Sequence, residues 1–417
     1  MIPKVLELAA ADGPPLRYRW VILFATWVAF LLTFVDRLAW ANVAVSAGES
    51  LGLAVAALGV FVTAFYVGYV TSNAMGGFFV DRFGGRLMLA LGLVLLGFFT
   101  YCFSHVRSVG AGILVQSLMG LAAGVDYAAC IKLLTAWFGI RDRGRAVGLF
   151  LTATSLGVVC TNLVVPTLLK RLGWGGVYQG LAAITLAWGV ITFLILRDAP
   201  SGASERSVDT PHFAVLFRNR DLLLLAAAGF GALWGTWGVA FWANALLVRG
   251  HGLSAEEAAR VVALFGIGAV IAKPIVGLIS DWLGGIRRVP ILICLVGFVL
   301  MLLVFGALRS DTAFMFAAPL LGVFAFVYSP LMAALIAEVA GQQLAGSATG
   351  LTNSFWQLGS AIVPLAVGAV YHASHSFYAA FITLAVGPLL GAIAMLLVRE
   401  PRRAVSVVPD VVQGPFS

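Results

Sequence analysis

The chain has 417 residues, of which 61% are hydrophobic and only 11% are charged, and its mean hydropathy is +1.01. A soluble globular domain carries about 25% charged residues, so this composition excludes one and predicts a protein that crosses a membrane many times. The net charge of +8 then fits basic loops beside a membrane better than nucleic-acid binding. All four cysteines lie inside apolar runs without metal-ligand spacing, so we expect no disulfide and no metal site.

A spanning helix needs about 20 mostly apolar residues. By that rule the sequence predicts an all-α membrane protein with twelve transmembrane helices, in two six-helix bundles at residues 20–196 and 221–398. A polar linker at 197–220 separates the bundles, and polar tails at 1–19 and 399–417 flank them. The expected spans lie near 20–42, 55–79, 87–105, 109–136, 145–168, 174–196, 221–247, 257–279, 289–308, 312–337, 346–370 and 376–398.

The distribution of Lys and Arg predicts the orientation of these spans. Most basic residues fall in the two tails, the linker and the loops on the same side of the membrane as the N-terminus. Cytoplasmic segments carry the excess of positive charge, so both termini and the linker are expected in the cytoplasm. We therefore expect a multi-pass protein of a lipid bilayer, the bacterial inner membrane.

A polar turn between the second and third expected spans occurs twice in the chain. Residues 77–86 read Gly-Phe-Phe-Val-Asp-Arg-Phe-Gly-Gly-Arg, and residues 277–285 repeat their glycines and aspartate at the same spacing. Such a repeat within equivalent apolar surroundings indicates an internal duplication. The residues that define the two copies are Gly77, Asp81, Arg82, Gly84 and Arg86 in the first and Gly277, Asp281 and Gly284 in the second.

This doubled turn resembles the signature loop of the major facilitator superfamily, and the twelve-span plan extends the resemblance over nearly the whole chain. The resemblance implies a secondary transporter with two pseudosymmetric bundles, acting as a monomer without cofactors. In that family the loop is a latch that holds the bundles in one state. A purely structural turn is the alternative, and the residues alone leave both open. The motif does not specify a substrate.

Away from the ends of the expected spans there are five ionisable residues: Asp36, Arg37, Asp126, Lys132 and Lys273. A charge at the middle of a bilayer costs at least about 2.5–3.5 kcal/mol on insertion scales, so it persists mainly where it faces a wet cavity or a partner. These residues are therefore the candidates for a site. Lys132, near the inner end of its span, is expected to reach the cytoplasm instead.

The adjacent Asp36 and Arg37 are similar to the Asp-Arg pair in the first span of the anion:cation symporter family. That resemblance implies that Arg37 binds an anionic substrate and that Asp36 takes part in proton coupling. Neighbours on a helix point about 100° apart, so the two side chains should meet different partners. The alternative is that both reach the outer interface or form structural pairs.

In span four the same symporter family has Arg-x-x-x-Gly and a Glu seven residues after the Arg. This chain has Gln116 and Ala123 at those positions, which leaves Asp126 as the carboxylate available for proton coupling. A fixed ion pair of Asp126 with Lys132 or Arg37 is the alternative.

Lys273 begins the run Lys-Pro-x-x-Gly-x-x-Ser-Asp, which is similar to the Arg-Pro run of the oxalate/formate antiporter family and, more loosely, to monocarboxylate transporters. The resemblance implies that Lys273 meets a substrate carboxylate. Lysine offers a point charge where arginine offers a planar fork, which argues against a planar dicarboxylate. The alternative is that Lys273 reaches toward the cytoplasm.

Aromatic and amide side chains in the spans are candidates for a cavity lining. Aromatic rings with one polar atom suit an organic anion that has an apolar body, although most such stripes are packing. The proposed substrate-binding residues of this kind are Tyr66, Tyr69, Asn73, Tyr127, Trp356 and Gln357, and Asn162, Trp234, Trp237, Trp242, Asn244 and Tyr328 are further possible lining residues.

Together these features predict proton-coupled uptake of a small organic anion, such as a carboxylate, by alternating access. An anion exchanger and a multidrug efflux transporter are the alternatives. We do not expect an enzyme, because the spans show no His/Glu metal cluster and no Ser/Lys dyad. No phosphate-cradling loop is present either, so ATP is not the expected energy source and no cofactor is predicted.

Overall fold

A computed structural model describes residues 17–138, 140–198, 218–282, 287–340 and 345–399. Within these ranges the chain is helical, and nine stretches are long and apolar enough to cross a membrane. The first part of the chain forms α2 (Tyr18–Ser50), the short 3-10 helix η1 (Val55–Leu58), α3 (Gly59–Phe83), α4 (Gly85–Phe103), α5 (Val109–Ala123), α6 (Asp126–Trp137) and α7 (Ile140–Ile195). The second part forms α9 (Arg220–His251), α10 (Ala255–Trp282), α11 (Arg288–Ala307), α12 (Asp311–Ala340), α13 (Ala345–Ser374) and α14 (Phe377–Leu397).

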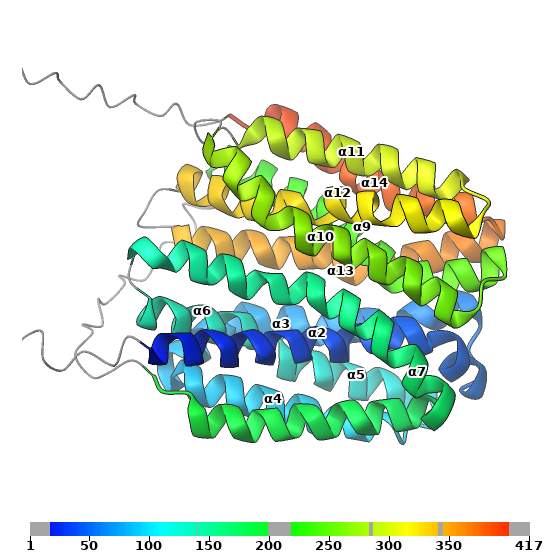
Figure 1. Ribbon diagram of the computed structural model, residues 1–417, viewed down its shortest axis with the longest axis horizontal. Helices are drawn as coiled ribbons and strands as arrows, with labels where there is room; N and C mark the ends of the chain where they lie inside the picture. The colour runs from blue at the N-terminus through cyan, green and yellow to red at the C-terminus, as the bar shows by residue number, and fades with distance from the viewer. Residues whose placement is uncertain (1–16, 139, 199–217, 283–286, 341–344, 400–417) are drawn as a thin grey trace, which may run out of the picture.

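The helices fall into two groups that follow the order of the chain. Helices α2 to α7 pack on one another and form the N-terminal half, and helices α9 to α14 form the C-terminal half. Figure 1 shows the two groups side by side, with α7 and α10 facing each other between them. The expected all-helical fold is thus confirmed, and the two halves meet along α2, α3 and α7 on one side and α9, α10 and α13 on the other.

Three expected spans of the N-terminal half fall in helices with irregular points inside or between them. The spans predicted at 145–168 and 174–196 correspond to the two helical parts of α7, which meet at Gly173, where the backbone leaves the helical conformation with a φ of 67° and a ψ of 173°. The span predicted at 109–136 corresponds to one apolar stretch, Val109–Trp137, which has a short break between α5 and α6 at Gly124 and Val125. A Cβ at Gly124 would lie 2.6 Å from the Tyr69 carbonyl oxygen, so α3 passes too close to this break for any larger residue.

Glycines at equivalent places in the halves let helices approach closely. A Cβ at Gly68 in α3 would lie 1.9 Å from the Ser117 carbonyl oxygen in α5. In the other half, a Cβ at Gly268 in α10 would lie 2.0 Å from the Pro319 carbonyl oxygen in α12. Small residues at such crossings are how membrane helices pack without a hydrophobic driving force. The same packing device therefore serves the corresponding helix pair of each half.

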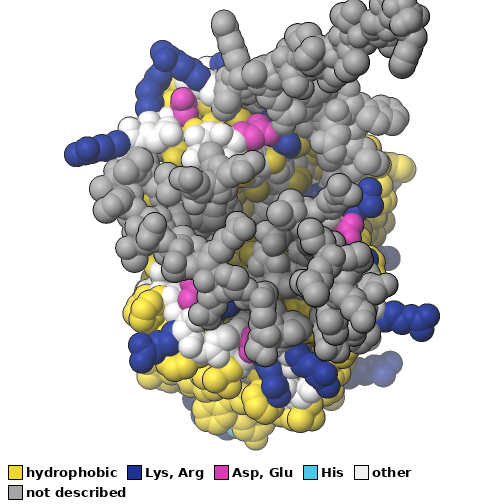
Figure 2. Space-filling view, turned by 90° about the vertical axis from the view of Figure 1, so that its left-hand side faces the viewer, with side chains coloured by type: hydrophobic (Ala, Val, Ile, Leu, Met, Phe, Trp, Pro, Cys, Tyr) yellow, Lys and Arg dark blue, Asp and Glu magenta, His cyan; other side chains and the backbone are white. Residues whose placement is uncertain are grey.

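The two ends of the molecule differ in charge. Figure 2 looks onto the end at which α2 begins, where Lys and Arg side chains surround the rim. We call this the basic end, and the residues around Arg19 and Arg197 belong to it. The opposite end, around Glu49 and Arg249, is called the far end. The expected assignment of the basic end to the cytoplasm stays a prediction.

Candidate functional site

Polar contacts join the two halves from the far end to the middle of the molecule. At the far end Lys170 of α7 pairs with Glu256 of α10 at 2.6 Å, and Glu49 of α2 pairs with Arg249 of α9. Deeper in, Thr63 of α3 donates a hydrogen bond of 2.8 Å to a carbonyl oxygen of α13. These contacts hold α2, α3 and α7 against α9, α10 and α13, and the charged candidates lie just below them.

Arg37 is buried at this junction, with 4% of its surface exposed. Its guanidinium lies 4.2 Å from the ring centroid of Tyr69, 4.5 Å from that of Phe34 and 5.5 Å from that of Tyr66. Its Nε and Nη2 atoms have no hydrogen-bond partner among the described residues. Cation–π contacts stabilise a guanidinium but leave these donors unsatisfied, which is costly in a buried position. An anion in contact with these atoms would remove that cost.

Asp126 provides the nearby negative charge. It begins α6 directly after the break at Gly124, and 3% of its surface is exposed. Its Oδ1 accepts a hydrogen bond of 2.5 Å from the backbone N–H of Tyr127, and its Oδ2 has no partner within the described part of the chain. Asp126 lies within electrostatic range of Arg37 without forming a direct ion pair with it. The expected alternative partner, Lys132, pairs instead with Asp81 at 3.2 Å.

Asp36 points away from Arg37 and into the N-terminal half. Its Oδ2 accepts a hydrogen bond of 2.8 Å from the Thr185 hydroxyl in α7, and 2% of its surface is exposed. Its Oδ1 has no partner in the ranges that the structure describes. Thr185 thus ties Asp36 to the contact between α2 and α7, as the angular separation of neighbouring helical residues predicts.

Lys273 crosses from one half to the other. Its ammonium donates a hydrogen bond of 2.8 Å to the Thr154 hydroxyl of α7, and it lies 4.9 Å from the ring centroid of Phe326 in α12. The side chain is partly buried and points toward the facing half. The N-terminal half therefore supplies the hydroxyl partner of the cation that the C-terminal half carries.

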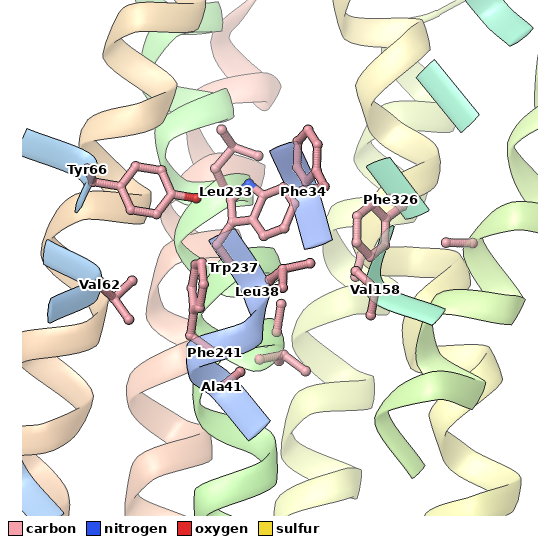
Figure 3. Packing of buried hydrophobic residues seen from close by; sticks show 14 of the residues in the cluster. Phe34, Leu38, Ala41, Val62, Tyr66, Val158, Leu233, Trp237, Phe241 and Phe326 are labelled. Carbon is pink, nitrogen blue, oxygen red and sulfur yellow. The ribbon is translucent and has the colours of Figure 1, made fainter. Parts of the chain in front are cut away.

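Three aromatic rings connect the two cations, and we call them the aromatic bridge: Phe34, Trp237 and Phe326. Phe34 stacks on Trp237 with centroids 5.4 Å apart, and Trp237 meets Phe326 edge to face at 6.1 Å. Figure 3 shows these rings next to one another at the junction of the halves. Arg37 lies over the first ring and Lys273 over the last. The bridge thus separates two cations that come from different halves.

Sequence reasoning missed Phe34 and Phe326. Phe34 precedes Arg37 by one helical turn, and that spacing was a usable signal. Phe326 lies in α12 and meets Lys273 only through the packing of α10 on α12, which no local pattern encodes. Trp237 was one of several possible lining residues.

The other predicted lining residues have different surroundings. Asn73 donates a hydrogen bond of 3.3 Å to the Gly124 carbonyl, which ties α3 to the break before α6. Tyr127 packs its ring against Phe150. Trp356 donates its indole N–H to the Leu225 carbonyl at 3.1 Å, in the contact between α13 and α9. Gln357 accepts a hydrogen bond of 3.4 Å from Ser360 on its own helix.

The first copy of the Gly-Asp turn forms contacts at the basic end. Gly84 has a φ of 87°, a value that suits glycine, and it ends α3. The backbone N–H of Arg86 donates to Asp198 at 3.0 Å, and its side chain donates to the Phe193 carbonyl at 2.8 Å. Asp81 holds Lys132, as noted above. The turn thereby fastens α3 and α4 to α6 and α7.

The remaining residues of the first turn lie at the surface, and those of the second turn are described only in part. Gly77 and Arg82 are exposed, and the Arg82 guanidinium lies over the ring of Phe83. In the second copy Gly284 lies outside the described residues. Gly277 and Asp281 belong to α10, but their side chains also lie outside what the structure describes. The latch stays a prediction.

No group of three or more His, Cys, Asp or Glu side chains that would suit a metal ion occurs in the described ranges. The charged candidates instead form a cation–carboxylate–aromatic arrangement. Chemically, a buried guanidinium can bind an anion, and a buried carboxylate can exchange a proton.

Comparisons with known proteins agree with this reading of the fold. A family model described as "Major Facilitator Superfamily" matches residues 24–364 and 252–415. The chain is 24% identical to the "Probable galactarate/D-glucarate transporter GudP" of Bacillus subtilis, over 94% of each chain. It is also 24% identical to the "Probable L-galactonate transporter" of Escherichia coli, over 92% of this chain and 90% of that one. The "Probable sulfoacetate transporter SauU" of Cupriavidus necator is 24% identical over 92% of this chain and 94% of its own length.

Solved structures show the same fold. A bacterial homologue of the human lysosomal transporter Spinster, in an inward-facing and unoccupied conformation, superposes with a TM-score of 0.73. That similarity covers 93% of this chain and 96% of the other, at 16% sequence identity. The family match spans most of the sequence and agrees with the doubled Gly-Asp turn. The chain therefore belongs to the major facilitator superfamily.

Proposed function

We propose that this protein is a secondary active transporter that takes up a small organic anion together with protons, by alternating access. The observation that carries the proposal is the pair of cations, Arg37 and Lys273, which the two halves place at opposite ends of the aromatic bridge. The names of the related proteins, which refer to sugar acids and a sulfonate, support an anionic substrate.

The membrane arrangement is part of the proposal. We count α5 and α6 as one crossing and α7, with its bend at Gly173, as two, which gives twelve crossings in two bundles of six. The bundles are residues 20–196 and 221–398, and the protein works as a monomer in the bacterial inner membrane. The basic end faces the cytoplasm, as the excess of Lys and Arg there predicts. The far-end ion pairs then close the site toward the outside.

The proposed substrate position follows from the unsatisfied groups. The substrate carboxylate takes the open donors of Arg37, because a planar guanidinium matches a carboxylate in two hydrogen bonds. The carbon body of the substrate lies against Trp237, whose ring offers a flat apolar surface at the junction. A second polar group of the substrate replaces the Thr154 hydroxyl on Lys273. One molecule would thus contact both halves.

Proton coupling follows from the position of Asp126. When Asp126 is charged it competes with the substrate for the electrostatic attraction of Arg37. When it is protonated that competition ends, and Arg37 binds the substrate carboxylate more strongly. Asp36 provides a second protonation site, where loss of charge alters the contact between α2 and α7 through Thr185. Substrate and proton then bind to the same state, as symport requires.

Uptake by proteoliposomes tests the proposal. Labelled galactarate, galactonate and sulfoacetate are offered with and without an imposed pH gradient, acid outside. We expect accumulation of at least one of these anions above its equilibrium level only with the gradient. Exchange of preloaded anion that ignores the gradient would instead show an anion exchanger. Outward pumping of lipophilic cations, without anion uptake, would show a multidrug exporter and overturn the proposal.

A further inference from the structure

A cavity separate from the aromatic bridge lies between the halves near the far end. Its volume is about 130 Å³, and its polar lining residues are Asn42, Ser46 and Glu49 of α2 and Asn244 of α9. Leu169 of α7 and Val248 of α9 are among the apolar ones. Its wall at Ala41 begins one helical turn beyond Arg37. We call it the far cavity.

Two amide groups in the far cavity have unused hydrogen-bonding capacity. Asn162 donates from Nδ2 to the Val158 carbonyl at 2.8 Å, which fixes the orientation of its amide. Its Oδ1 then accepts from Nδ2 of Asn244 at 2.8 Å, across the junction of α7 and α9. This chain of donors leaves Oδ1 of Asn244 as an acceptor without a partner among the described residues, on a side chain that is only 5% exposed. Nδ2 of Asn42 is a buried donor that also has no partner among the described residues.

The charges around the far cavity cancel. Glu49, on its rim, pairs with Arg249, so neither attracts a charged ligand strongly. Ser46 donates its hydroxyl to the Val43 carbonyl at 3.1 Å and keeps only acceptor capacity. A fitting occupant is therefore neutral, carries at least one group that both donates and accepts, and has an apolar flank for the Leu and Val side chains. Hydroxyl groups meet these requirements.

We propose that the far cavity is a second binding site, for a small neutral molecule with adjacent hydroxyl groups. One hydroxyl donates to Oδ1 of Asn244 and another accepts from Nδ2 of Asn42. A cavity of about 150 Å³ holds benzene, which has six heavy atoms, so a four-carbon diol is of the right size. Both halves build the site, so its occupant stabilises the arrangement in which the far end is closed.

Binding of 1,2-butanediol to the intact protein in lipid nanodiscs tests the site. Saturation-transfer NMR compares the wild type with Asn244→Leu and Asn162→Leu. Both variants lose the amide bond between α7 and α9, but only Asn244→Leu removes the acceptor of the far cavity. We expect the diol signal to fall at least about fivefold in Asn244→Leu and to stay within about twofold of the wild type in Asn162→Leu, given that a neutral hydrogen bond contributes about 1 kcal/mol.

Several results would overturn the proposal. One is an equal diol signal in the wild type and Asn244→Leu, which would mean that the amides serve only water or packing. Another is an equal Asn244-dependent signal from 2-butanone, which lacks hydroxyl donors. If Asn244→Leu does not fold, by size-exclusion chromatography and thermal melting, Asn42→Val replaces it with the same expectation.

The effect on conformation is measured separately and needs no transported substrate. Spin labels at Arg107 and Arg309, exposed at the far ends of the two halves, report the distance between them in a background without the native cysteines. The diol should increase the short-distance population in the wild type and leave Asn244→Leu unchanged. No shift in the wild type would contradict the stabilising role. Because neither measurement involves an anion, their failure is distinct from failure of the proposed transport.

Discussion

Arg37 and Lys273 carry the same charge to the two ends of the aromatic bridge, but they are held in different ways. The rings around Arg37 come from α2 and α3, both in its own half. Lys273 donates to Thr154, which belongs to the opposite half. A movement of one half against the other would therefore keep these rings beside Arg37, although Phe34 would leave Trp237, and would break the Lys273 contact. In the proposed cycle Arg37 is therefore a fixed anchor, whereas Lys273 changes partner when the halves move.

The two cations also differ in counter-charge. Asp126 lies in the same half as Arg37 and within its electrostatic range. Lys273 is satisfied by a neutral hydroxyl. Protonation of one carboxylate thus changes the field at Arg37 directly, while Lys273 responds mainly to the arrangement of the halves. The proposed coupling of proton, substrate and movement depends on this division.

Removing the anchor should have the largest effect. We expect Arg37→Gln to lower the uptake kcat/KM by roughly 100-fold or more, because charge-assisted hydrogen bonds contribute up to about 3 kcal/mol. Arg37→Lys keeps the charge but loses the planar guanidinium and much of its stacking on the rings, and it should lower kcat/KM by about tenfold. Initial rates in proteoliposomes measure both. Arg107→Gln, at an exposed far-end position, is the matched control and should transport normally. Uptake by Arg37→Gln at the wild-type rate would remove the anchor from the mechanism.

Much of this arrangement was visible in the sequence, for physical reasons. A charge in an apolar run is costly, so the positions of Arg37, Asp126 and Lys273 singled them out without any structure. The partners of these residues were not visible. Thr154 meets Lys273, and Phe326 lies under it, only because α7, α10 and α12 pack together.

Helix boundaries were predicted less well than helix existence. Apolarity marks the membrane core, whereas helical hydrogen bonding continues past it into polar residues. The polar segment around Lys170 therefore belongs to α7 and ends only at the bend at Gly173. Conversely, the break before Asp126 interrupts an apolar run that a hydropathy rule counts as one span.

Neutralising the counter-charge should separate proton coupling from binding. In Asp126→Asn we expect the accumulation of anion driven by a pH gradient to fall at least about tenfold, because no proton is taken up with the substrate. Exchange of labelled for unlabelled anion should persist, because Arg37 then has no competing carboxylate. Asp142→Asn, which changes a carboxylate paired with Arg19 at the basic end, is the control. Gradient-driven accumulation that survives in Asp126→Asn would move proton coupling elsewhere, with Asp36 the next residue to change.

Lys273 has two proposed roles, contact with the substrate and contact with the opposite half, and two substitutions separate them. Each should affect uptake less than Arg37→Gln. Lys273→Gln removes the cation that we propose contacts the substrate, and it should raise the KM of uptake by roughly tenfold. Thr154→Val removes only the partner in the opposite half, which is worth about 1 kcal/mol, and should change KM by less than about threefold while shifting the far-end distance between spin labels. Arg260→Gln, an exposed cation on the same helix, is the control for Lys273→Gln. Equal effects of both substitutions on KM would mean that Lys273 serves only to join the halves.

Removing a far-end ion pair should have the smallest effect on uptake, although these pairs join the two halves directly. The side chains of these two pairs are 39–65% exposed, and exposed pairs contribute about 0.2–1 kcal/mol each. Glu49→Gln should therefore change uptake by less than about fivefold and broaden the far-end distance distribution slightly. High salt should have a similar effect on the wild type, because it screens exposed charges. Glu49→Gln could instead impair transport as strongly as Arg37→Gln. The far-end ion pairs would then determine the arrangement of the halves, and the contrast between Arg37 and Lys273 would no longer explain the cycle.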